Sequence, residues 1–313
     1  MVERNTPIDL VIPFYNDSDE KWRKVLQEYM LEDNTSDRQV SGEERYRDWG
    51  NLKYWFRCVE ENCKWVNKVF LIVASETQIP KWLDRNNTKL RIVLHKEYIP
   101  EKLLPTFNTF TIENFIPLIK DLSNNFVYCN DDYFFLNETT KEMFFVNDYP
   151  VYEDTKTELK EFDTNGIDGT FYSILNNGMG LQLKINGDKA KWYAITHLPE
   201  PYKKDNALEI LKSNFDYFIK ANSTSRFRSR EKLSNHLYNC IYKDTKLYYK
   251  FNVYKNSSYV SITKDTDFNN YKDKQMVCFN DTQRLSKEDF EEVKNKMILF
   301  FENKVPNKSS FEK

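Results

Sequence analysis

The first 136 residues alternate between short apolar runs and longer stretches in which apolar positions recur at helical spacing. Four apolar runs predict strands, at residues 8–14, 69–74, 90–95 and 125–130. Three amphipathic stretches predict helices, at residues 21–32, 52–63 and 108–118. Strands separated by helices need crossover connections, which are typical of a mainly parallel sheet. The pattern therefore predicts an α/β fold, with a Rossmann-like sheet flanked by helices.

The pattern weakens after residue 136. Five of the seven glycines lie between residues 137 and 195, which predicts a loop-rich segment. Ser286, with Asp289 three residues later, predicts the start of a last helix. The polar residues 303–313 predict a frayed tail. Further helices are predicted at 203–220 and 231–242, and strands at 247–254 and 275–279. We divide the chain into the N-terminal part of the core, a loop-rich and helical insertion, and C-terminal strands with a helix that complete the core: 1–136, 137–245 and 246–313.

Composition narrows the class of protein. A net charge of −2 gives no electrostatic argument for a nucleic acid partner or an anionic membrane. No stretch approaches the roughly 20 apolar residues of a spanning helix, and residues 1–7 carry no hydrophobic signal region. The five cysteines are scattered, which favours reduced packing residues over disulfides. We expect a cytoplasmic enzyme without a transmembrane segment, for which peripheral contact with a membrane-bound assembly stays open.

The most informative chemistry follows the predicted strand at 125–130. Asn130, Asp131 and Asp132 lie where open α/β sheets bind ligands, and their oxygens suit Mg²⁺ or Mn²⁺. Two adjacent carboxylates about 4 Å apart repel by roughly 4 kcal/mol at an effective dielectric of 20. A cation removes that cost, as does alternation to opposite faces. A solvated turn explains the same triplet, since Asn-Asp is common turn chemistry.

The residues around this triplet resemble the second conserved block of the Stealth family in order and spacing. That family comprises sugar-phosphate transferases, including bacterial capsule polysaccharide phosphotransferases and the lysosomal-targeting N-acetylglucosamine-1-phosphotransferase. The matching segments are Arg45-Tyr-Arg-Asp-Trp-Gly-Asn-Leu-Lys-Tyr54, Trp65-Val-Asn-Lys-Val-Phe70, Gln78-Ile-Pro-Lys-Trp-Leu83, Ile92-Val-Leu-His-Lys-Glu-Tyr-Ile-Pro100, Leu104-Pro-Thr-Phe-Asn-Thr-Phe-Thr-Ile-Glu113 and the triplet's own strand.

Three shorter segments resemble the other family blocks. The first lies at residues 8–19, where Tyr15, Asn16 and Asp17 occupy the places of the usual Val-Asp-Gly. The third lies at residues 197–202 with Arg226 and Arg228 downstream, and the fourth at residues 276–281. Together with the second block they span most of the chain.

The resemblance implies attack by an acceptor hydroxyl on the β-phosphorus of a nucleotide sugar. In such a transfer the protein contributes mainly by positioning the reactants and neutralising their negative charge. Asp131 and Asp132 are the expected catalytic carboxylates. His197 is the expected general base or charge-stabilising donor, with a turn residue before Pro199 as the alternative. The expected ligands of the divalent metal, Mg²⁺ or Mn²⁺, are Asn130, Asp131, Asp132, Asn280 and Asp281.

Eight further residues are expected to bind substrate, and all of them except Asp9 have a structural alternative. Asp9 and Asp19 are expected to flank the nucleotide, although a loop carboxylate explains Asp19 equally well. The second-block candidates have local alternatives, namely pairing with Asp48 for Arg45, a satisfied backbone bond for His95, and helix capping for Asn108 and Thr109. We expect His95 to face the same crevice as Asn130. Arg226 and Arg228 are expected to bind phosphate oxygens in a bidentate manner, with a solvated basic loop as the alternative.

Three functions compete at this point. The first is a hexose-1-phosphate or N-acetylhexosamine-1-phosphate transferase, with a nucleotide-sugar donor and a glycan acceptor of a capsule or cell wall. The second is a metal-dependent glycosyltransferase that transfers the sugar alone. The third is a non-catalytic glycan-binding protein that uses the abundant aromatic residues, 16% of the chain. Release of nucleoside monophosphate indicates the first function, and release of nucleoside diphosphate indicates the second. The fold alone does not separate them, because one fold hosts many chemistries.

Overall fold

The central sheet is built from the predicted apolar runs and one later strand. A computed structural model describes residues 6–33, 46–153, 156–166, 168–250, 252, 255–281 and 285–313. The sheet order is β10-β4-β1-β2-β3, in which β1 to β4 are parallel and β10 is antiparallel to β4. The strands are β1 (Ile8–Pro13), β2 (Val69–Val73), β3 (Leu90–Leu94), β4 (Asn125–Tyr128) and β10 (Glu200–Lys203). The predicted Rossmann-like fold class is confirmed.

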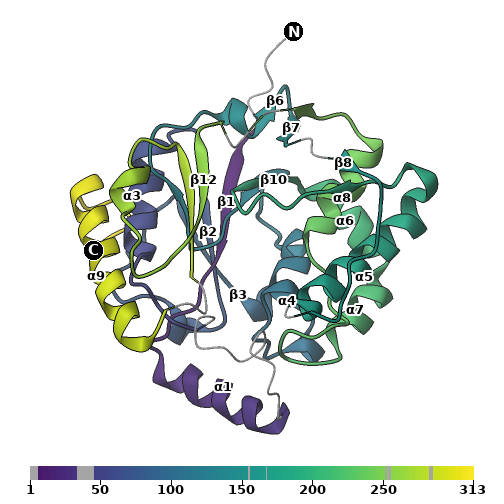
Figure 1. Cartoon of the computed structure of the whole chain (residues 1–313), viewed down its shortest axis with the longest axis horizontal. Coiled ribbons are helices and arrows are strands. Elements are labelled where there is room, and N and C mark those ends of the chain that lie inside the picture. The colour runs from purple at the N-terminus through teal and green to yellow at the C-terminus, as the bar shows by residue number, and fades with distance from the viewer. Residues whose placement is uncertain are drawn as a thin grey trace.

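Both faces of this sheet are covered, which explains its continuous apolar strands. Leu10 and Ile12 of β1 face one hydrophobic cluster, while Val11 between them faces the other. Figure 1 shows helices α3 (Leu52–Asn62) and α9 (Lys287–Lys304) on one side of the sheet. The helices on the other side are α4 (Thr109–Asn114), α5 (Gly169–Asn186), α6 (Lys204–Ser213), α7 (Phe215–Asn222) and α8 (His236–Thr245).

The strand order fixes where a ligand site can form. From β1 the chain adds β2 and β3 on one side, then crosses to add β4 on the other side of β1. The carboxyl ends of β1 and β4 therefore border the topological switch point, where open α/β sheets bind ligands. Because β10 is antiparallel, its first residue, Glu200, lies opposite Tyr128 at the last position of β4. The segment that precedes β10 thus reaches the same edge of the sheet.

A second sheet adjoins this edge. It has the order β12-β13-β5 and consists of β5 (Tyr133–Phe135), β12 (Ser257–Ser261) and β13 (Met276–Asn280). The C-terminal strands therefore form a separate sheet rather than extending the central one. Phe134, Val277 and Phe279 nevertheless bury their side chains in the same cluster as Leu10. They contribute to the core by packing, not by strand pairing with β1.

The remaining elements are short, apart from α1. Besides α1 (Glu20–Asp33), they comprise β6 (Phe145–Val146), β7 (Tyr149–Tyr152), β8 (Lys156–Thr157), β9 (Trp192–Tyr193) and β11 (Tyr249–Lys250). The 3-10 turns are η2 (Glu76–Gln78), η3 (His95–Glu97), η4 (Glu101–Leu103), η5 (Ile116–Leu118), η6 (Lys141–Met143), η7 (Gly187–Lys189) and η9 (Phe268–Tyr271). Among the described residues, no helix is both long and apolar enough to cross a membrane.

The glycine-rich segment differs most from its prediction. It contains α5, a helix of 18 residues, where loops were expected. Gly178 lies against α8, where an added Cβ would lie 3.5 Å from the Leu237 Cβ. That distance is an ordinary van der Waals contact, so the packing of α5 on α8 does not require glycine here. The helix predicted at 203–220 is divided into α6 and α7 at Asn214. In the strand predicted at 247–254, β11 covers two residues, and 251, 253 and 254 lie outside the described part of the chain.

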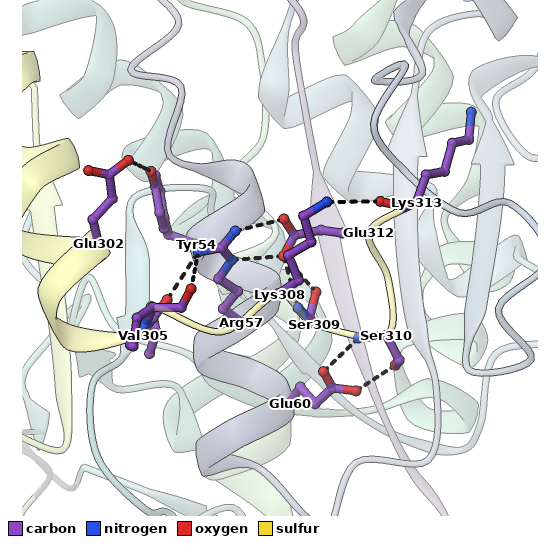
Figure 2. A network of polar contacts seen from close by, with 11 residues as sticks. Tyr54, Arg57, Glu60, Glu302, Val305, Lys308, Ser309, Ser310, Glu312 and Lys313 are labelled. Atoms are coloured by element: carbon purple, nitrogen blue, oxygen red, sulfur yellow. Dashed lines mark hydrogen bonds and ion pairs between the residues drawn. The ribbon is translucent and has the colours of Figure 1, made fainter.

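The end of the chain is well packed, so the prediction of a frayed tail is wrong. Val305 and Phe311 are buried, with 1% and 3% of their surface exposed. Glu312 accepts two hydrogen bonds of 2.8 Å from the guanidinium of Arg57 on α3, as Figure 2 shows. In contrast, the predicted start of α9 is confirmed, because the Ser286 hydroxyl caps the helix.

Candidate active site

Two strand ends that are distant in sequence meet at the carboxyl edge of the central sheet. β5 begins directly after Asp132, and β13 ends at Asn280. The backbone N–H of Phe279 donates to the carbonyl of Asp132 at 2.9 Å, and Tyr133 pairs with Cys278 across the two strands. The second sheet therefore holds the triplet after β4 beside the end of β13, as the sequence predicted.

The surroundings of Asp131 and Asp132 disfavour a negative charge on either carboxyl group. Burial, then repulsion by Asp48, raises the pKa of Asp131 to about 6. Burial, then repulsion by Asp131, raises the pKa of Asp132 to about 7, although a hydrogen bond from Cys278 acts in the other direction. The Oδ1 atom of Asp132 is buried and has no hydrogen-bond partner among the described residues. An unpartnered carboxylate oxygen beside a second carboxylate suits a cation.

Asp281 has a different environment from this pair. It accepts hydrogen bonds from Arg47 Nη2 at 2.7 Å, from Arg47 Nε at 3.1 Å and from Trp49 Nε1 at 3.1 Å. Its charge is therefore already matched by an arginine. Within the described residues, no three His, Cys, Asp or Glu side chains are arranged to hold a metal ion. Asp131 and Asp132 still fit Mg²⁺, because Mg²⁺ usually binds one or two carboxylates together with substrate phosphates and water.

His197 lies at the same edge of the sheet, in the segment that leads into β10. Its backbone has a φ of 49°, in the left-handed region that residues other than glycine seldom adopt. Such conformations concentrate at functional sites. The ring is exposed and packs against Tyr259, with 5.1 Å between ring centroids. Partial desolvation lowers the pKa of His197, opposed by Glu200 and reinforced by His236. A neutral imidazole at the sheet edge that also carries Asp131 and Asp132 suits a general base.

Glu200 and His236 form a structural pair behind His197. The His236 Nδ1 lies 3.8 Å from Glu200 Oε2, and Glu200 also accepts hydrogen bonds from Thr196 and Asn239. Burial opposes ionisation of Glu200, but His236 lowers its pKa to about 2. His236 Nε2 contacts the carbonyl of Tyr193 at 2.8 Å. These contacts fix the start of β10 and agree with a structural role for His236.

A buried glutamate orients Asn130. The Tyr128 hydroxyl lies between Glu113 Oε1 and Asn130 Oδ1. One hydroxyl proton can be donated to only one of these oxygens at a time. Burial raises the pKa of Glu113 to about 7, and the hydrogen bond from Tyr128 acts in the opposite direction. The Tyr128 hydroxyl therefore links a buried carboxyl group to the side-chain amide of Asn130.

The structure separates the two candidate arginines. The guanidinium of Arg228 lies 4.7 Å from the ring centroid of Phe110, and its charge lowers the pKa of Glu113 against the effect of burial. Arg226 instead donates from Nη1 to the carbonyl of Lys102 at 3.0 Å. Arg228 is therefore the arginine of this loop that lies beside the Glu113–Tyr128–Asn130 chain.

A buried lysine supports that arginine loop. Lys232 has no exposed surface, and its Nζ donates to the carbonyls of Asn222 at 2.9 Å and Ser225 at 2.6 Å. Phe227 stacks on Phe107, with ring centroids 5.1 Å apart. The loop is therefore clamped from two sides, which restricts where Arg228 can lie.

Comparison with known proteins identifies the group to which the chain is similar. The family model for Stealth protein conserved region 2 matches residues 45–153. A capsular polysaccharide phosphotransferase WcwK of Streptococcus pneumoniae is 33% identical, with 98% of each chain covered. The chain belongs to the Stealth family. It is 31% identical over the whole length of both chains to the receptor polysaccharide phosphotransferase WefC of Streptococcus gordonii. The exopolysaccharide phosphotransferase cps2G of Lactiplantibacillus plantarum is 30% identical over 98% of this chain and 96% of its own. The prediction of a phosphotransferase enzyme is confirmed.

The first Stealth block forms the loop between β1 and α1. Asn16 is tied to Gln78 by its backbone N–H, at 2.7 Å, and by its side chain. Asp19 caps the start of α1, and its other oxygen accepts from Thr77 and Gln78. Burial opposes ionisation of Asp19, but these hydrogen bonds together lower its pKa. In this Stealth member, Asn16 and Asp19 thus hold the loop against η2 by side-chain hydrogen bonds.

Two other candidates lie away from the crevice. Asp9 is fully buried near the start of β1, at the amino edge, where it accepts from Asn67, Lys68 and Ser123. The structure therefore gives it the role of a buried anchor at the edge opposite Asn130. His95 follows β3, which β1 and β2 separate from β4. The expectation that His95 faces the crevice of Asn130 is thus corrected: it is buried, and burial lowers its pKa to about 3.

The remaining second-block candidates have local roles or lie outside the description. Asn108 is buried and caps α4, accepting from the N–H of Phe110 at 3.2 Å. Thr109, the first residue of α4, is exposed. Arg45 lies outside the described residues.

The structure adds residues that sequence reasoning had not assigned to the site. Arg47 and Asp48 lie in residues 45–54, which resemble the second Stealth block, so this resemblance could have indicated a role for them. Glu113 is the last residue of the similar segment 104–113. No sequence signal pointed to Tyr259, because its place depends on how the second sheet pairs.

Proposed function

We propose that this Stealth protein transfers a hexose-1-phosphate or N-acetylhexosamine-1-phosphate from a nucleotide sugar to a hydroxyl of a capsule or cell-wall glycan. The acceptor oxygen would form a bond to the β-phosphorus, and the bond from that phosphorus to the bridging oxygen would break. The products would be a phosphodiester and a nucleoside monophosphate, and the acceptor proton would pass to the enzyme. Three polysaccharide phosphotransferase relatives that align along the whole chain support the polysaccharide role.

The observation that carries the proposal is the convergence of Asp131 and Asp132 with His197 at one edge of the sheet. The carboxylates follow β4, and His197 precedes β10, which pairs with β4. If a divalent metal binds, Asp131 and Asp132 would hold it, and it would offset negative charge on the diphosphate. Without a compensating positive charge, the ionised forms of Asp131 and Asp132 would repel the negatively charged diphosphate of the donor.

His197 is proposed as the general base. Its pKa is lowered by desolvation, so the imidazole is neutral at pH 7 and can accept the proton of the attacking hydroxyl. Glu200 limits that lowering, and the contacts of Glu200 with Thr196 and Asn239 hold it behind the histidine. The left-handed backbone at His197 turns its ring toward Tyr259 rather than into the core.

The donor phosphates are proposed to lie between the triplet and the arginine loop. Arg228 offers a planar guanidinium suited to phosphate oxygens. Asn130, whose side-chain oxygen lies within hydrogen-bond distance of the Tyr128 hydroxyl, would offer its amide NH₂ to the same phosphates. The nucleotide is proposed to extend toward the β1–α1 loop, because that loop follows the carboxyl end of β1 at the topological switch point.

The experiment combines a donor panel with product analysis. Purified protein is incubated with Mg²⁺ or Mn²⁺ and with UDP-glucose, UDP-galactose, UDP-N-acetylglucosamine or UDP-N-acetylgalactosamine, each with a glycan acceptor. Mass spectrometry should detect nucleoside monophosphate and a product heavier by a sugar phosphate. Asp131→Asn and Asp132→Asn should abolish both products, whereas Arg226→Lys serves as a folded control. Nucleoside diphosphate as the product would instead establish a conventional glycosyltransferase.

A further inference from the structure

One face of the second sheet lies beside Asp132. Residues on neighbouring strands lie side by side in the row Tyr133, Cys278 and Tyr259, according to the strand register. The alternate positions, such as Val277 and Val260, bury their side chains in the core on the other face. The Cys278 thiol donates to Asp132 Oδ2 at 3.4 Å, so the row lies on the face of the sheet that carries Asp132.

Exposure changes along this row. Tyr133 and Cys278 are buried, with 5% and 0% of their surface exposed, whereas Tyr259 is 45% exposed. In the described part of the chain, β12 is the edge strand of its sheet, so no described strand covers Tyr259. The tyrosine thus lies at the outer end of the row, where the row meets solvent.

The surroundings of Tyr259 link it to the proposed reaction centre. Its ring lies 5.1 Å from that of His197, at an interplanar angle of 45°. Its phenol interacts with Ser261 and Asn280, and Asp132 is close enough to disfavour its ionisation. An exposed aromatic ring therefore borders the base candidate and lies close to Asp132.

From this geometry we infer that Tyr259 is the platform for the acceptor glycan, stacking on the sugar ring whose hydroxyl approaches His197. The inference rests on the proposed function, because it assumes that His197 takes the acceptor proton. The apolar C–H face of a sugar can pack on an aromatic ring, which combines a large contact area with a polar edge. A position beside the base brings the attacking hydroxyl close to the imidazole, as proximity requires.

The layout of the sheet separates acceptor from donor. The loop after β1, which is proposed to meet the nucleotide, is tied to Gln78 after β2. His197 and Tyr259 lie on the β10 side of β4 instead. Asp131 and Asp132 follow β4, between the two sides. A platform at Tyr259 thus leaves the nucleotide side open.

The test compares Tyr259→Ala and Tyr259→Phe with wild type in two reactions. One is transfer to an acceptor, with KM measured for methyl glycosides of glucose, galactose, N-acetylglucosamine and N-acetylgalactosamine. The other is hydrolysis of the donor by water, which needs the same base but no sugar platform. Tyr249→Ala is the matched control, because Tyr249 is 43% exposed on β11. Saturation-transfer NMR with the same glycosides reports binding without turnover.

Tyr259→Ala should raise the acceptor KM by about three- to tenfold, the range expected for loss of one aromatic contact. It should leave donor hydrolysis within about twofold of wild type, since that reaction does not use the platform. Tyr259→Phe and Tyr249→Ala should behave like wild type in both reactions. An unchanged acceptor KM, or equal losses in transfer and hydrolysis, would overturn the inference. If wild type releases no nucleoside monophosphate, the proposed function fails, while loss of the NMR signal in Tyr259→Ala alone would still support a sugar platform.

Discussion

The carboxylate of Asp132 should cost the protein stability when no cation is bound. Burial and repulsion by Asp131 raise its pKa from 3.8 to about 7. A raised pKa means that the folded state binds the proton more tightly than the unfolded state. The stability gained from proton binding is complete below about pH 4 and is lost as the pH rises through about 7. The substitution Asp132→Asn removes this penalty while keeping the shape of the side chain.

The size of the effect follows from the pKa difference. Each pKa unit corresponds to about 1.4 kcal/mol, so titration of Asp132 lowers the free energy of unfolding by about 4 kcal/mol at pH 8 and about 2 kcal/mol at pH 5, relative to low pH. Relaxation and water at this partly buried side chain reduce both figures. Asp132→Asn should therefore raise the free energy of unfolding, and the gain should be about 2 kcal/mol larger at pH 8 than at pH 5. The same variant should be inactive in transfer, a trade of activity for stability.

The assay is urea unfolding followed by tryptophan fluorescence, in EDTA, at pH 5 and pH 8. Asp281→Asn is the matched control, because the same chemical change there removes the partner of a largely buried Arg47. It should lower the free energy of unfolding by about 3 kcal/mol, opposite in sign to Asp132→Asn. Mg²⁺ should stabilise wild type at pH 8 more than Asp132→Asn. If the stability gain of Asp132→Asn does not grow with pH, the carboxyl is not held in a raised-pKa state and the reasoning fails.

Three further changes separate the other roles. His197→Ala should lower kcat by about 10²- to 10⁴-fold, as for loss of a general base, with donor affinity nearly unchanged; an unaltered kcat in single-turnover assays would demote the histidine to a turn residue. Arg228→Lys should raise the donor KM by about tenfold, because lysine lacks the planar fork, and Arg226→Lys should not; equal effects would contradict the separation of the two arginines. Glu312→Gln should lower the melting temperature without changing kcat, and because the Glu312 pKa is lowered in the folded state, its stabilising contribution should vanish as the pH falls below about 4.5. A Glu312→Gln variant as stable as wild type at pH 7 would show that the tail ion pair is not needed.

Local patterns in the sequence were sufficient for much of the framework. Continuous apolar runs specified β1 and β2, because strands covered on both faces are predominantly apolar. Ser286 specified the start of α9, since capping depends on residues three apart. The order and spacing of the family segments specified the Stealth family and the phosphotransferase class. Each of these inferences uses residues that are neighbours in the chain.

Tertiary structure decided which polar residues share an environment. Asp132 and Asp281 both follow apolar strands, and only the fold shows that one has an unpartnered oxygen while the other binds Arg47, 234 positions away. Asp9 likewise became a buried anchor because Ser123 donates to it from across the sheet edge. The tail was predicted to fray from its polar composition, but contacts with α3 bury it. Burial and long-range pairing set the energy of a charged group, and neither can be deduced from its sequence neighbours.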